Sequence, residues 1–475
     1  MLWIADPRQV GNKTRALHLL IAKEEITMSK SKQVSRRSFI RRMATTGAAG
    51  MAVPYFVGGN ALGQKGKPGA NDKIGLGLIG CGGMGRGNLK NCANSPDVVV
   101  TGACDIWKTR RDAVVAQYQS PAKPYDDYRE MLQAKDIDAV IIATPPHWHC
   151  RMAVDACRAG KDIYLQKPMT LHVGESLAVR NAVRRHRRIS QIGTQIHAGE
   201  NYRRVVEFVR SGKLGKISVA RTFNVMNQGP GGIGNTPDSD PPAEIDWDLW
   251  VGPGSMRAFN SLIVRDAYTH CSFMDCSGGW TPGMAPHIID LPVWALDLGY
   301  PRTTYCSGGR YLIKDAGDAP DVQEVVWQYP DFTMTWMMSL VNSFAFDFGR
   351  GQPARRLGIY FHGVNGTMYA NYGMHQIVPE GDRLKDTNPP GKSIPPSPGH
   401  EREWLDCIKS RQQPSCNADY HCKIDVPICL ANLSMRLGRA IHFDPAVEEI
   451  VGDAEALRLS VPEYRDPWKF PIEYI

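Results

Sequence analysis

A glycine-rich run, Gly80-Cys81-Gly82-Gly83-Met84-Gly85, directly follows the apolar segment 73–79. In this G-x-G-x-x-G pattern the first glycine permits a tight turn, the second lets the backbone approach a pyrophosphate, and the third lets a helix pack on a strand. Asp105 ends the next apolar segment, where a carboxylate accepts ribose hydroxyls and repels a 2′-phosphate. The alternative is a turn that binds nothing. We predict an NAD site formed by Gly80, Gly82, Gly83, Met84, Gly85 and Asp105. Binding of NADP stays open, because three cations that could hold a 2′-phosphate follow closely, namely Lys108, Arg110 and Arg111.

Two further runs, ATPPHWH at 143–149 and YLQKP at 164–168, also stand at the ends of strand-like segments. Carboxyl ends of strands face the ligand crevice of an open α/β sheet. We therefore expect four of these residues at the cofactor, namely Thr144, Pro145, His149 and Gln166, and we expect His147 at the substrate. Packed or helix-capping histidines are the alternative, and a metal site is disfavoured because no carboxylate neighbours them in sequence.

Lys167, within the second run, is the candidate for proton transfer. A lysine at a crevice is usually a solvated charge. Desolvation beside a cofactor, together with nearby positive charge, would instead lower its pKa and let it exchange a proton with a substrate hydroxyl.

The segment 278–290, GGWTPGMAPHIID, carries the other candidate catalytic residues. Its glycines and prolines predict an entry loop, after which His287 opens a helix that ends near Leu298. Asp290 follows His287 by about one turn, so both are expected on one face. We predict His287 and Asp290 as catalytic. A buried histidine with a helix-terminal carboxylate is the alternative. Trp280 is a candidate stacking surface for a sugar ring, or else a core tryptophan, and His270 is a candidate substrate residue.

The residues 71–195 that must position these groups alternate strand-like and helical patterns. Strand-like runs are 73–79, 98–104, 139–144, 162–165 and 189–194, and helical patterns include 150–159 and 174–185. Strands that alternate with helices predict an α/β fold with a doubly wound parallel sheet, a Rossmann domain.

The residues 196–475 have a different texture and predict a second α/β domain that holds the substrate. A helix at 201–211 precedes strand-like runs at 216–224, 303–308, 324–329, 333–339, 358–362 and 366–370. Several alternate with period two, which is typical of a sheet covered on one face. Helical patterns return at 400–409 and 424–439.

Taken in order, these motifs resemble the exported members of the Gfo/Idh/MocA family of oxidoreductases. The resemblance also includes DWDLWVGP at 246–253, and ANLSMRLGR at 431–439 with GDAEA at 452–456, which resemble the bacterial-type C-terminal region. It implies a Rossmann domain and a C-terminal α/β domain built on a large, open, mostly antiparallel sheet. That sheet often forms the oligomer interface, so a homo-oligomer is expected. Members commonly oxidise or reduce sugars and cyclitols with NAD or NADP.

The resemblance places the family's motif lysine on Lys167 and its catalytic histidine on His287. Two positions depart from the pattern. Gln166 stands where the commoner motif has glutamate, and Gly283 stands where the family has an aspartate four residues before the histidine. Since glycine cannot orient or protonate a partner, the usual relay is in doubt, and Asp290, His270 or Tyr268 are the candidates to replace the acid.

The basic N-terminus predicts export. Residues 1–63 contain ten Lys/Arg and three Asp/Glu, so their net charge is +7 out of +8 for the whole chain. Residues 64–475 therefore have a net charge of only +1, which gives no electrostatic footprint for nucleic-acid binding. Ser35-Arg36-Arg37-Ser38-Phe39-Ile40 and the apolar run after it resemble a twin-arginine signal. We expect a signal at 1–63, whose first 27 residues are an over-extended start, and a linker at 64–70. The protein would then use the twin-arginine machinery and be periplasmic, without a membrane anchor.

Twelve cysteines without a C-x-x-C pair predict buried thiols, with a Cys416–Cys422 disulfide as the alternative.

For function, we predict an enzyme that transfers a hydride between NAD(P) and a sugar or polyol carbon. One alternative is a redox-neutral enzyme that cleaves glycosides through a transient ketosugar, which suits an exported protein because free NAD is scarce outside the cytoplasm. The other is a non-catalytic ligand-binding protein. The sequence predicts no metal.

Overall fold

The structure, a computed structural model, describes residues 72–346 and 355–475. The expected signal at 1–63 and linker at 64–70 lie outside the described residues. Among the helices that are described, none has the length and apolar character needed to cross a membrane.

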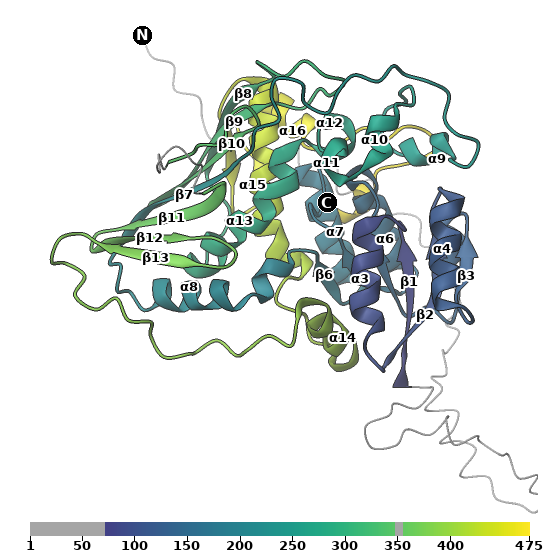
Figure 1. Cartoon of the computed structure of the whole chain (residues 1–475), viewed down its shortest axis with the longest axis horizontal. Coiled ribbons are helices and arrows are strands. Elements are labelled where there is room, and N and C mark those ends of the chain that lie inside the picture. Colours follow the sequence, from purple (N-terminus) through teal and green to yellow (C-terminus); the bar gives the residue numbers. More distant parts are fainter. Residues whose placement is uncertain (1–71, 347–354) are drawn as a thin grey trace, which may run out of the picture. The chain divides into compact units, whose positions relative to one another are not determined.

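The first sheet has six parallel strands in the order β3-β2-β1-β4-β5-β6 (Figure 1). Its strands are β1 (Ile74–Ile79), β2 (Val98–Cys104), β3 (Lys123–Tyr125), β4 (Ala139–Ile142), β5 (Asp162–Leu165) and β6 (Ser190–Ile192). The chain reverses its direction of travel across the sheet between β1 and β4. In doubly wound folds a ligand crevice opens there, beyond the carboxyl ends of the strands. The predicted Rossmann sheet is confirmed.

Helices cover both faces of this sheet, which is why β1, β4 and β5 are buried along their whole length. The covering helices from the same half of the chain are α3 (Gly83–Ala93), α4 (Lys108–Tyr118), α5 (Tyr128–Gln133), α6 (His149–Arg158) and α7 (Val173–His186). A short 3-10 turn, Pro146–Trp148, precedes α6. Strand β3 was not expected from the sequence, since its three residues are exposed or half-buried and include Pro124.

The second sheet has nine strands in the order β13-β12-β11-β7-β10-β9-β8-β14-β15. All neighbouring pairs are antiparallel except β10 and β7. Its strands are β7 (Ile217–Val225), β8 (Thr303–Gly309), β9 (Val322–Tyr329), β10 (Phe332–Ser339), β11 (Leu357–Gly363), β12 (Gly366–Ala370), β13 (His375–Pro379), β14 (Ile441–Asp444) and β15 (Glu449–Ile450). This agrees with the expected large, mostly antiparallel sheet.

One face of the nine-stranded sheet is buried, as the alternation in β9 and β10 shows. Trp327 and Trp336 point from this face into a core shared with Ile288 and Leu291. The remaining helices are α8 (Glu200–Arg210), α9 (Trp247–Val251), α10 (Ser261–Arg265), α11 (Ala267–His270), α12 (Met274–Ser277), α13 (Trp280–Leu296), α14 (His400–Ser410), α15 (Ala418–Leu437) and α16 (Ala454–Leu459); 3-10 turns lie at Gln195–Ala198 and Ile472–Tyr474.

Two C-terminal helices return to the first sheet. Trp404 of α14 joins the core on the α3 face. Helix α15 contributes to two cores, because Val426 and Leu430 pack against the first sheet while Ile424 and Ile428 pack under the second. The described residues accordingly belong to one compact unit. The division at 195/196 into two domains stays a prediction.

Helix α13 differs from its prediction. The segment expected as an entry loop is helical from Trp280, so His287 lies within the helix and does not open it. Pro282 is tolerated because the first turn has no use for its missing N–H. Pro286 and Pro292 lie inside the helix, and burial of almost the whole segment outweighs the hydrogen bonds that they remove.

The turn between β1 and α3 requires glycine at its first and last positions. Gly80 has φ +93°, a left-handed conformation that a side chain disfavours, and a Cβ there would lie 2.6 Å from the Ala143 carbonyl oxygen. A Cβ on Gly85 would lie 2.0 Å from the Gly80 carbonyl oxygen. The third glycine therefore lets α3 pack against the strand ends.

We expect Gly85→Ala to lower the free energy of unfolding by about 1–3 kcal/mol, because the added methyl group must push α3 away from the turn. Gly87→Ala is the matched control in the same helix, since a Cβ there meets nothing within 4 Å. It should raise stability by up to about 1 kcal/mol through helix propensity alone. Urea unfolding followed by circular dichroism measures both. Equal effects of the two substitutions would contradict the packing argument.

Candidate active site

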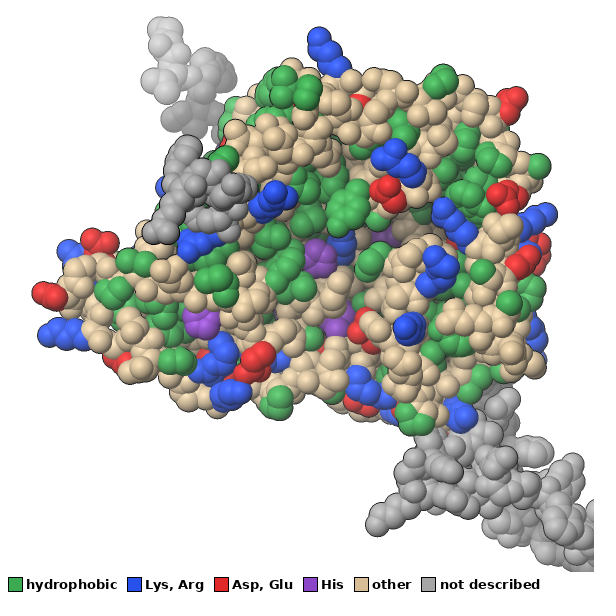
Figure 2. Space-filling view, viewed as in Figure 1, with side chains coloured by type: hydrophobic (Ala, Val, Ile, Leu, Met, Phe, Trp, Pro, Cys, Tyr) green, Lys and Arg blue, Asp and Glu red, His purple; other side chains and the backbone are tan. Residues whose placement is uncertain are grey.

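A crevice of about 660 Å³ opens at the carboxyl ends of the first sheet, between the Gly80 turn and the segment from α10 to α13. Histidine and basic side chains are visible inside a hollow near the middle of the face shown in Figure 2. Thirteen residues named individually from the sequence line the crevice, namely Gly80, Gly82, Gly83, Met84, Asp105, Arg110, Thr144, Pro145, Gln166, Lys167, Tyr268, His270 and Gly283.

The cofactor half of the crevice begins at the glycine-rich turn. A Cβ on Gly82 or Gly83 would meet nothing within 4 Å, so the backbone of this turn faces open space. No side chain caps α3, and its first turn contains no acidic residue. An uncapped helix N-terminus favours a bound phosphate through its free N–H groups and its dipole. The turn therefore fits the pyrophosphate of a dinucleotide.

Asp105 lies where an adenosine ribose is bound in Rossmann domains. Its Oδ2 accepts the Cys81 N–H at 2.6 Å and its Oδ1 accepts the Trp107 N–H at 2.8 Å. Burial raises the pKa of Asp105, while these hydrogen bonds oppose the shift. The two bonds hold the carboxylate against the glycine-rich turn, and each oxygen keeps a lone pair for a ribose hydroxyl.

Lys167 lies at the end of β5 and reaches across the crevice to α13. Its Nζ donates a hydrogen bond to the Gly283 carbonyl oxygen at 2.7 Å. Among the described residues it contacts no carboxylate, and burial lowers its pKa. A Cβ on Gly283 would lie 3.1 Å from Cys271 Sγ, so the thiol takes part of the space that a side chain at 283 would use. Burial raises the pKa of Cys271 to about 11, which keeps it a thiol.

Gln166 fixes the backbone before Lys167. Its Nε2 donates to Asn88 Oδ1 at 2.6 Å, and Asn88 in turn donates to Tyr164 and Glu401. The amide is buried yet borders the crevice. Gln166 thus links β5 to α3 and lies beside the predicted cofactor site.

The substrate half of the crevice contains His270 and Tyr268 of α11. Burial, with the neighbouring His147 and Lys167, lowers the pKa of His270 to about 4, so its imidazole is neutral at pH 7. Tyr268 is 64% exposed, and its ring lies 5.9 Å from that of Trp280. Helix α11 therefore presents a neutral imidazole and an exposed aromatic face next to Lys167.

His147 and His149 do not line the crevice, although the sequence analysis expected ligand contacts of both. His147 Nε2 lies 3.0 Å from the Trp250 carbonyl oxygen. The two ring nitrogens of His149 lie 2.8 and 2.9 Å from the carbonyl oxygens of Pro168 and Thr144. Burial lowers the pKa of His149 to about 4, so its ring is neutral and donates only one of these bonds. His149 therefore ties the segments that follow β4 and β5 together, whereas His147 ties the segment after β4 to α9 and α12.

Two predicted site residues are turned into the interior. Asp290 is completely buried, where it contacts His197 Nδ1 at 3.0 Å and accepts a 2.5 Å hydrogen bond from Tyr420. Although burial opposes it, this carboxylate holds the pKa of His197 well above its ordinary value. Trp280 is 1% exposed and packs in the core of the second sheet. Asp290 is therefore not placed to assist Lys167, and Trp280 cannot stack on a sugar.

His287 lies behind the crevice wall. Burial, followed by the charge of Lys167, lowers its pKa well below the usual range. Its carbonyl oxygen accepts a hydrogen bond from Tyr202, while its Nδ1 is buried without a partner among the described residues. Its ring lies 6.3 Å from that of Tyr372, whose hydroxyl also lacks a partner within the described chain.

The sequence patterns did not predict Cys271 or the segment 263–267, which line the crevice, nor Tyr372, which lies behind its wall beside His287. None belongs to a spacing pattern, and each reaches the site only through the tertiary fold. Cys416 and Cys422 are both free thiols, so the alternative disulfide is wrong. Within the described ranges, no group of three or more His, Cys, Asp or Glu side chains is arranged to hold a metal ion.

Comparisons with known proteins agree with this architecture. Residues 74–194 match the family model described as the Gfo/Idh/MocA oxidoreductase family, NAD-binding Rossmann fold, and residues 349–470 match its C-terminal alpha/beta domain. The expected bacterial-type C-terminal region stays a prediction. The fold is similar to that of the WlbA dehydrogenase from Bordetella pertussis, solved with NADH and UDP-GlcNAcA, with a TM-score of 0.58 and 17% identity over 78% of this chain and 99% of that chain.

Two curated relatives match part of the chain. The inositol 2-dehydrogenase of Salmonella paratyphi B is 30% identical over 142 residues, 30% of this chain and 42% of that protein. A glycosyl hydrolase family 109 protein of Saccharopolyspora erythraea is 28% identical over 208 residues, 40% of this chain and 45% of that protein. The chain thus spans less than half the length of these relatives. With both family models matched in order, the chain belongs to the Gfo/Idh/MocA oxidoreductase family and carries its NAD-binding Rossmann domain.

Proposed function

We propose that this protein is an NAD-dependent dehydrogenase that acts on a hydroxyl-bearing carbon of a sugar or polyol. The observation that carries the proposal is Lys167, a desolvated amine without a carboxylate partner in the described chain, at the same sheet edge as the dinucleotide turn. A bound nicotinamide accepts or returns the hydride.

Lys167 is the proposed proton-transfer group. Because burial lowers its pKa, a larger fraction of the amine is neutral near pH 7 and able to take a proton from a hydroxyl. The hydrogen bond to Gly283 holds Nζ in the crevice. His270, whose ring makes no hydrogen bond within the described chain, is placed to orient the same hydroxyl.

The substrate half suits a polyhydroxylated ring. Tyr268 offers the exposed aromatic face that had been expected of Trp280, and sugar rings stack on such faces. Behind it, His287 Nδ1 and the Tyr372 hydroxyl are polar atoms that nothing in the described chain satisfies. Buried polar atoms without partners are costly, so a substrate hydroxyl that reached past the crevice wall would be favoured there.

NAD is favoured over NADP by the arrangement around Asp105. Arg111, which the sequence analysis considered for a 2′-phosphate, pairs with Asp112 and Asp126. Arg110 lies over the ring of Trp107, 3.8 Å from its centre. The Asp105 carboxylate at the ribose position repels a phosphate.

We expect the purified protein to reduce NAD with at least one sugar or cyclitol, such as myo-inositol, glucose or galactose. The reaction is followed by the increase in NADH absorbance. Lys167→Met should slow that reaction by about 10²–10⁴-fold while NADH binding, followed by fluorescence, is retained. Lys123→Met, far from the crevice on exposed β3, serves as the control. Unchanged turnover in Lys167→Met would contradict the role of this amine.

The second candidate is redox-neutral glycoside cleavage, favoured by the similarity to glycosyl hydrolase family 109 proteins. Product analysis by chromatography separates the two. Aryl glycoside cleavage without net NADH would support the second candidate, whereas net NADH with an intact glycosidic bond would support the first.

We expect Gly283→Asp to raise the pKa of Lys167, since a carboxylate beside the amine stabilises its charged form. For oxidation the neutral amine is required, so the acid limb of kcat/KM against pH should move to higher pH by about one unit or more. Gly283→Asn is the matched control, because it adds a side chain of the same size next to Cys271 without the charge. If the aspartate and asparagine variants had the same pH profile, Lys167 would not be the titrating group.

We also propose that the protein is exported by the twin-arginine route, from the Arg36-Arg37 pair and the apolar run that follows. Replacing both arginines by lysine should leave the protein in the cytoplasm when cells are fractionated. The same double change at Arg41 and Arg42 makes an identical charge-conserving replacement in the same leader and should leave export intact. Periplasmic recovery of the Arg36-Arg37 variant would contradict the proposal.

A further inference from the structure

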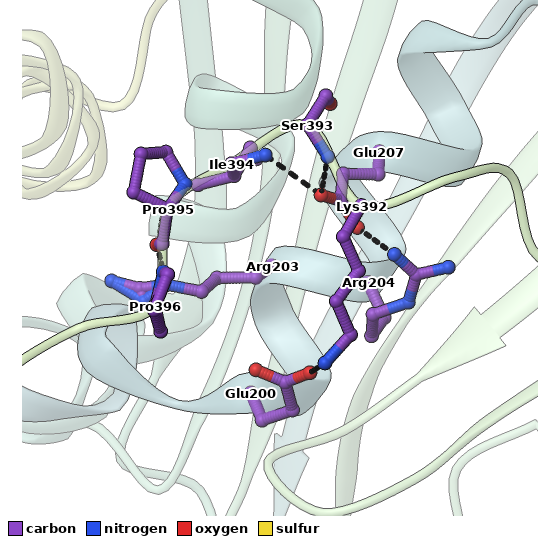
Figure 3. A pocket seen from close by; sticks show the side chains of 9 residues that line it. All are labelled: Glu200, Arg203, Arg204, Glu207, Lys392, Ser393, Ile394, Pro395 and Pro396. Carbon is purple, nitrogen blue, oxygen red and sulfur yellow. Dashed lines mark hydrogen bonds and ion pairs between the residues drawn. The ribbon is translucent and has the colours of Figure 1, made fainter.

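A second cavity, of about 270 Å³, lies between α8 and the segment 392–396. Figure 3 shows side chains from two successive turns of α8 facing this segment. Its lining holds three cations, Arg203, Arg204 and Lys392, against two carboxylates, Glu200 and Glu207. None of these residues belongs to the crevice that contains Lys167.

Both carboxylates in this cavity are already satisfied. Glu200 pairs with Lys392 at 2.7 Å on the exposed rim. Glu207 is buried and accepts the N–H groups of Ser393 and Ile394 at 2.6 and 2.8 Å, together with Nη1 of Arg204. Arg204 Nη2 also donates to the Pro390 carbonyl oxygen at 2.5 Å.

Arg203 is the exception in this set. It is 8% exposed, and among the described residues no carboxylate pairs with it. Its Nε donates to the Pro395 carbonyl oxygen at 3.3 Å, while its Nη1 is buried and has no partner in the described chain. In Figure 3 its side chain runs toward Pro395 and Pro396. Glu200 lies within electrostatic range of Arg203 but is paired with Lys392, so the buried guanidinium is incompletely neutralised and an anion would be favoured at this position.

We propose that this cavity binds a small oxyanion, a phosphate or carboxylate group, on the guanidinium of Arg203. The planar fork of arginine matches the paired oxygens of such groups. The cavity has the net positive charge that an anion needs, because its three cations outnumber its two carboxylates. The volume admits an ion of phosphate size.

The site connects to residues behind the crevice wall through the neighbouring residues of α8. The Tyr202 hydroxyl donates to the His287 carbonyl oxygen at 2.9 Å, and Asn201 Nδ2 donates to the Asn371 carbonyl oxygen at 2.8 Å, next to Tyr372. An anion on Arg203 would therefore stabilise the helix that supports His287 and Tyr372.

Calorimetric titration of the full-length protein with inorganic phosphate, at fixed ionic strength, tests the proposal. We expect one phosphate per chain, with the same affinity in the presence and absence of NADH. Arg203→Gln should weaken this affinity at least roughly tenfold. Arg210→Gln is the control, because it makes the same chemical change on the same helix, where Arg210 donates to the Trp294 carbonyl oxygen outside the cavity.

No phosphate binding, equal binding in Arg203→Gln, or binding that NADH abolishes would each overturn the proposal, the last because it would locate phosphate in the cofactor turn. If Arg203→Gln does not fold, as judged by circular dichroism, the anion site is tested instead in wild-type crystals soaked in arsenate. An anomalous peak beside Arg203 would support the site, and an empty cavity would overturn it.

Discussion

The two-sided burial of α15 is the constraint on which the active site depends. One stripe of this helix, with Val426 and Leu430, completes the core of the parallel sheet, and another, with Ile424 and Ile428, completes the core under the antiparallel sheet. A helix that is buried nearly all round can be stable only between two layers. Because it is packed on both sides, the sheets cannot slide freely past each other, and the end of β5 remains opposite the start of α13. The 2.7 Å bond from Lys167 to Gly283 spans that junction.

The same bond determines how Lys167 can act. A lysine paired with a carboxylate keeps its proton strongly, whereas a lysine bound to a neutral carbonyl in a desolvated crevice loses part of that stabilisation. Gly283 therefore does more than omit a side chain. It contributes a backbone acceptor, and the missing Cβ leaves space that is shared by the crevice and the Cys271 thiol. Glycine in place of the family's aspartate at position 283 therefore favours a lower pKa of Lys167, while the Gly283 carbonyl oxygen still holds its Nζ in the crevice.

Much of the fold could be predicted, because the strands of the first sheet are short apolar runs with a glycine-rich turn at the right place. Strands β3 and β13 were missed because they are mostly exposed and carry little apolar signal. The start of α13 was missed because prolines and glycines usually break helices, and only tertiary burial reverses that rule here. Asp290 was misassigned for a related reason. Its partners His197 and Tyr420 lie 93 and 130 residues away, so no local pattern reveals that its carboxylate is already engaged.

The structural histidines differ from those of the site in whether their ring nitrogens have hydrogen-bond partners. His147, His149 and His197 are committed to backbone carbonyls or to a carboxylate, which explains why they stand near the strand ends without facing the crevice. His270 is left with a free neutral ring in the crevice, and His287 with a buried nitrogen behind it. Folding rarely leaves such atoms unpaired, because each one costs free energy that packing must offset. His270 and His287 both lie within electrostatic range of Lys167, and the polar substrate proposed above would supply the hydrogen bonds that they lack.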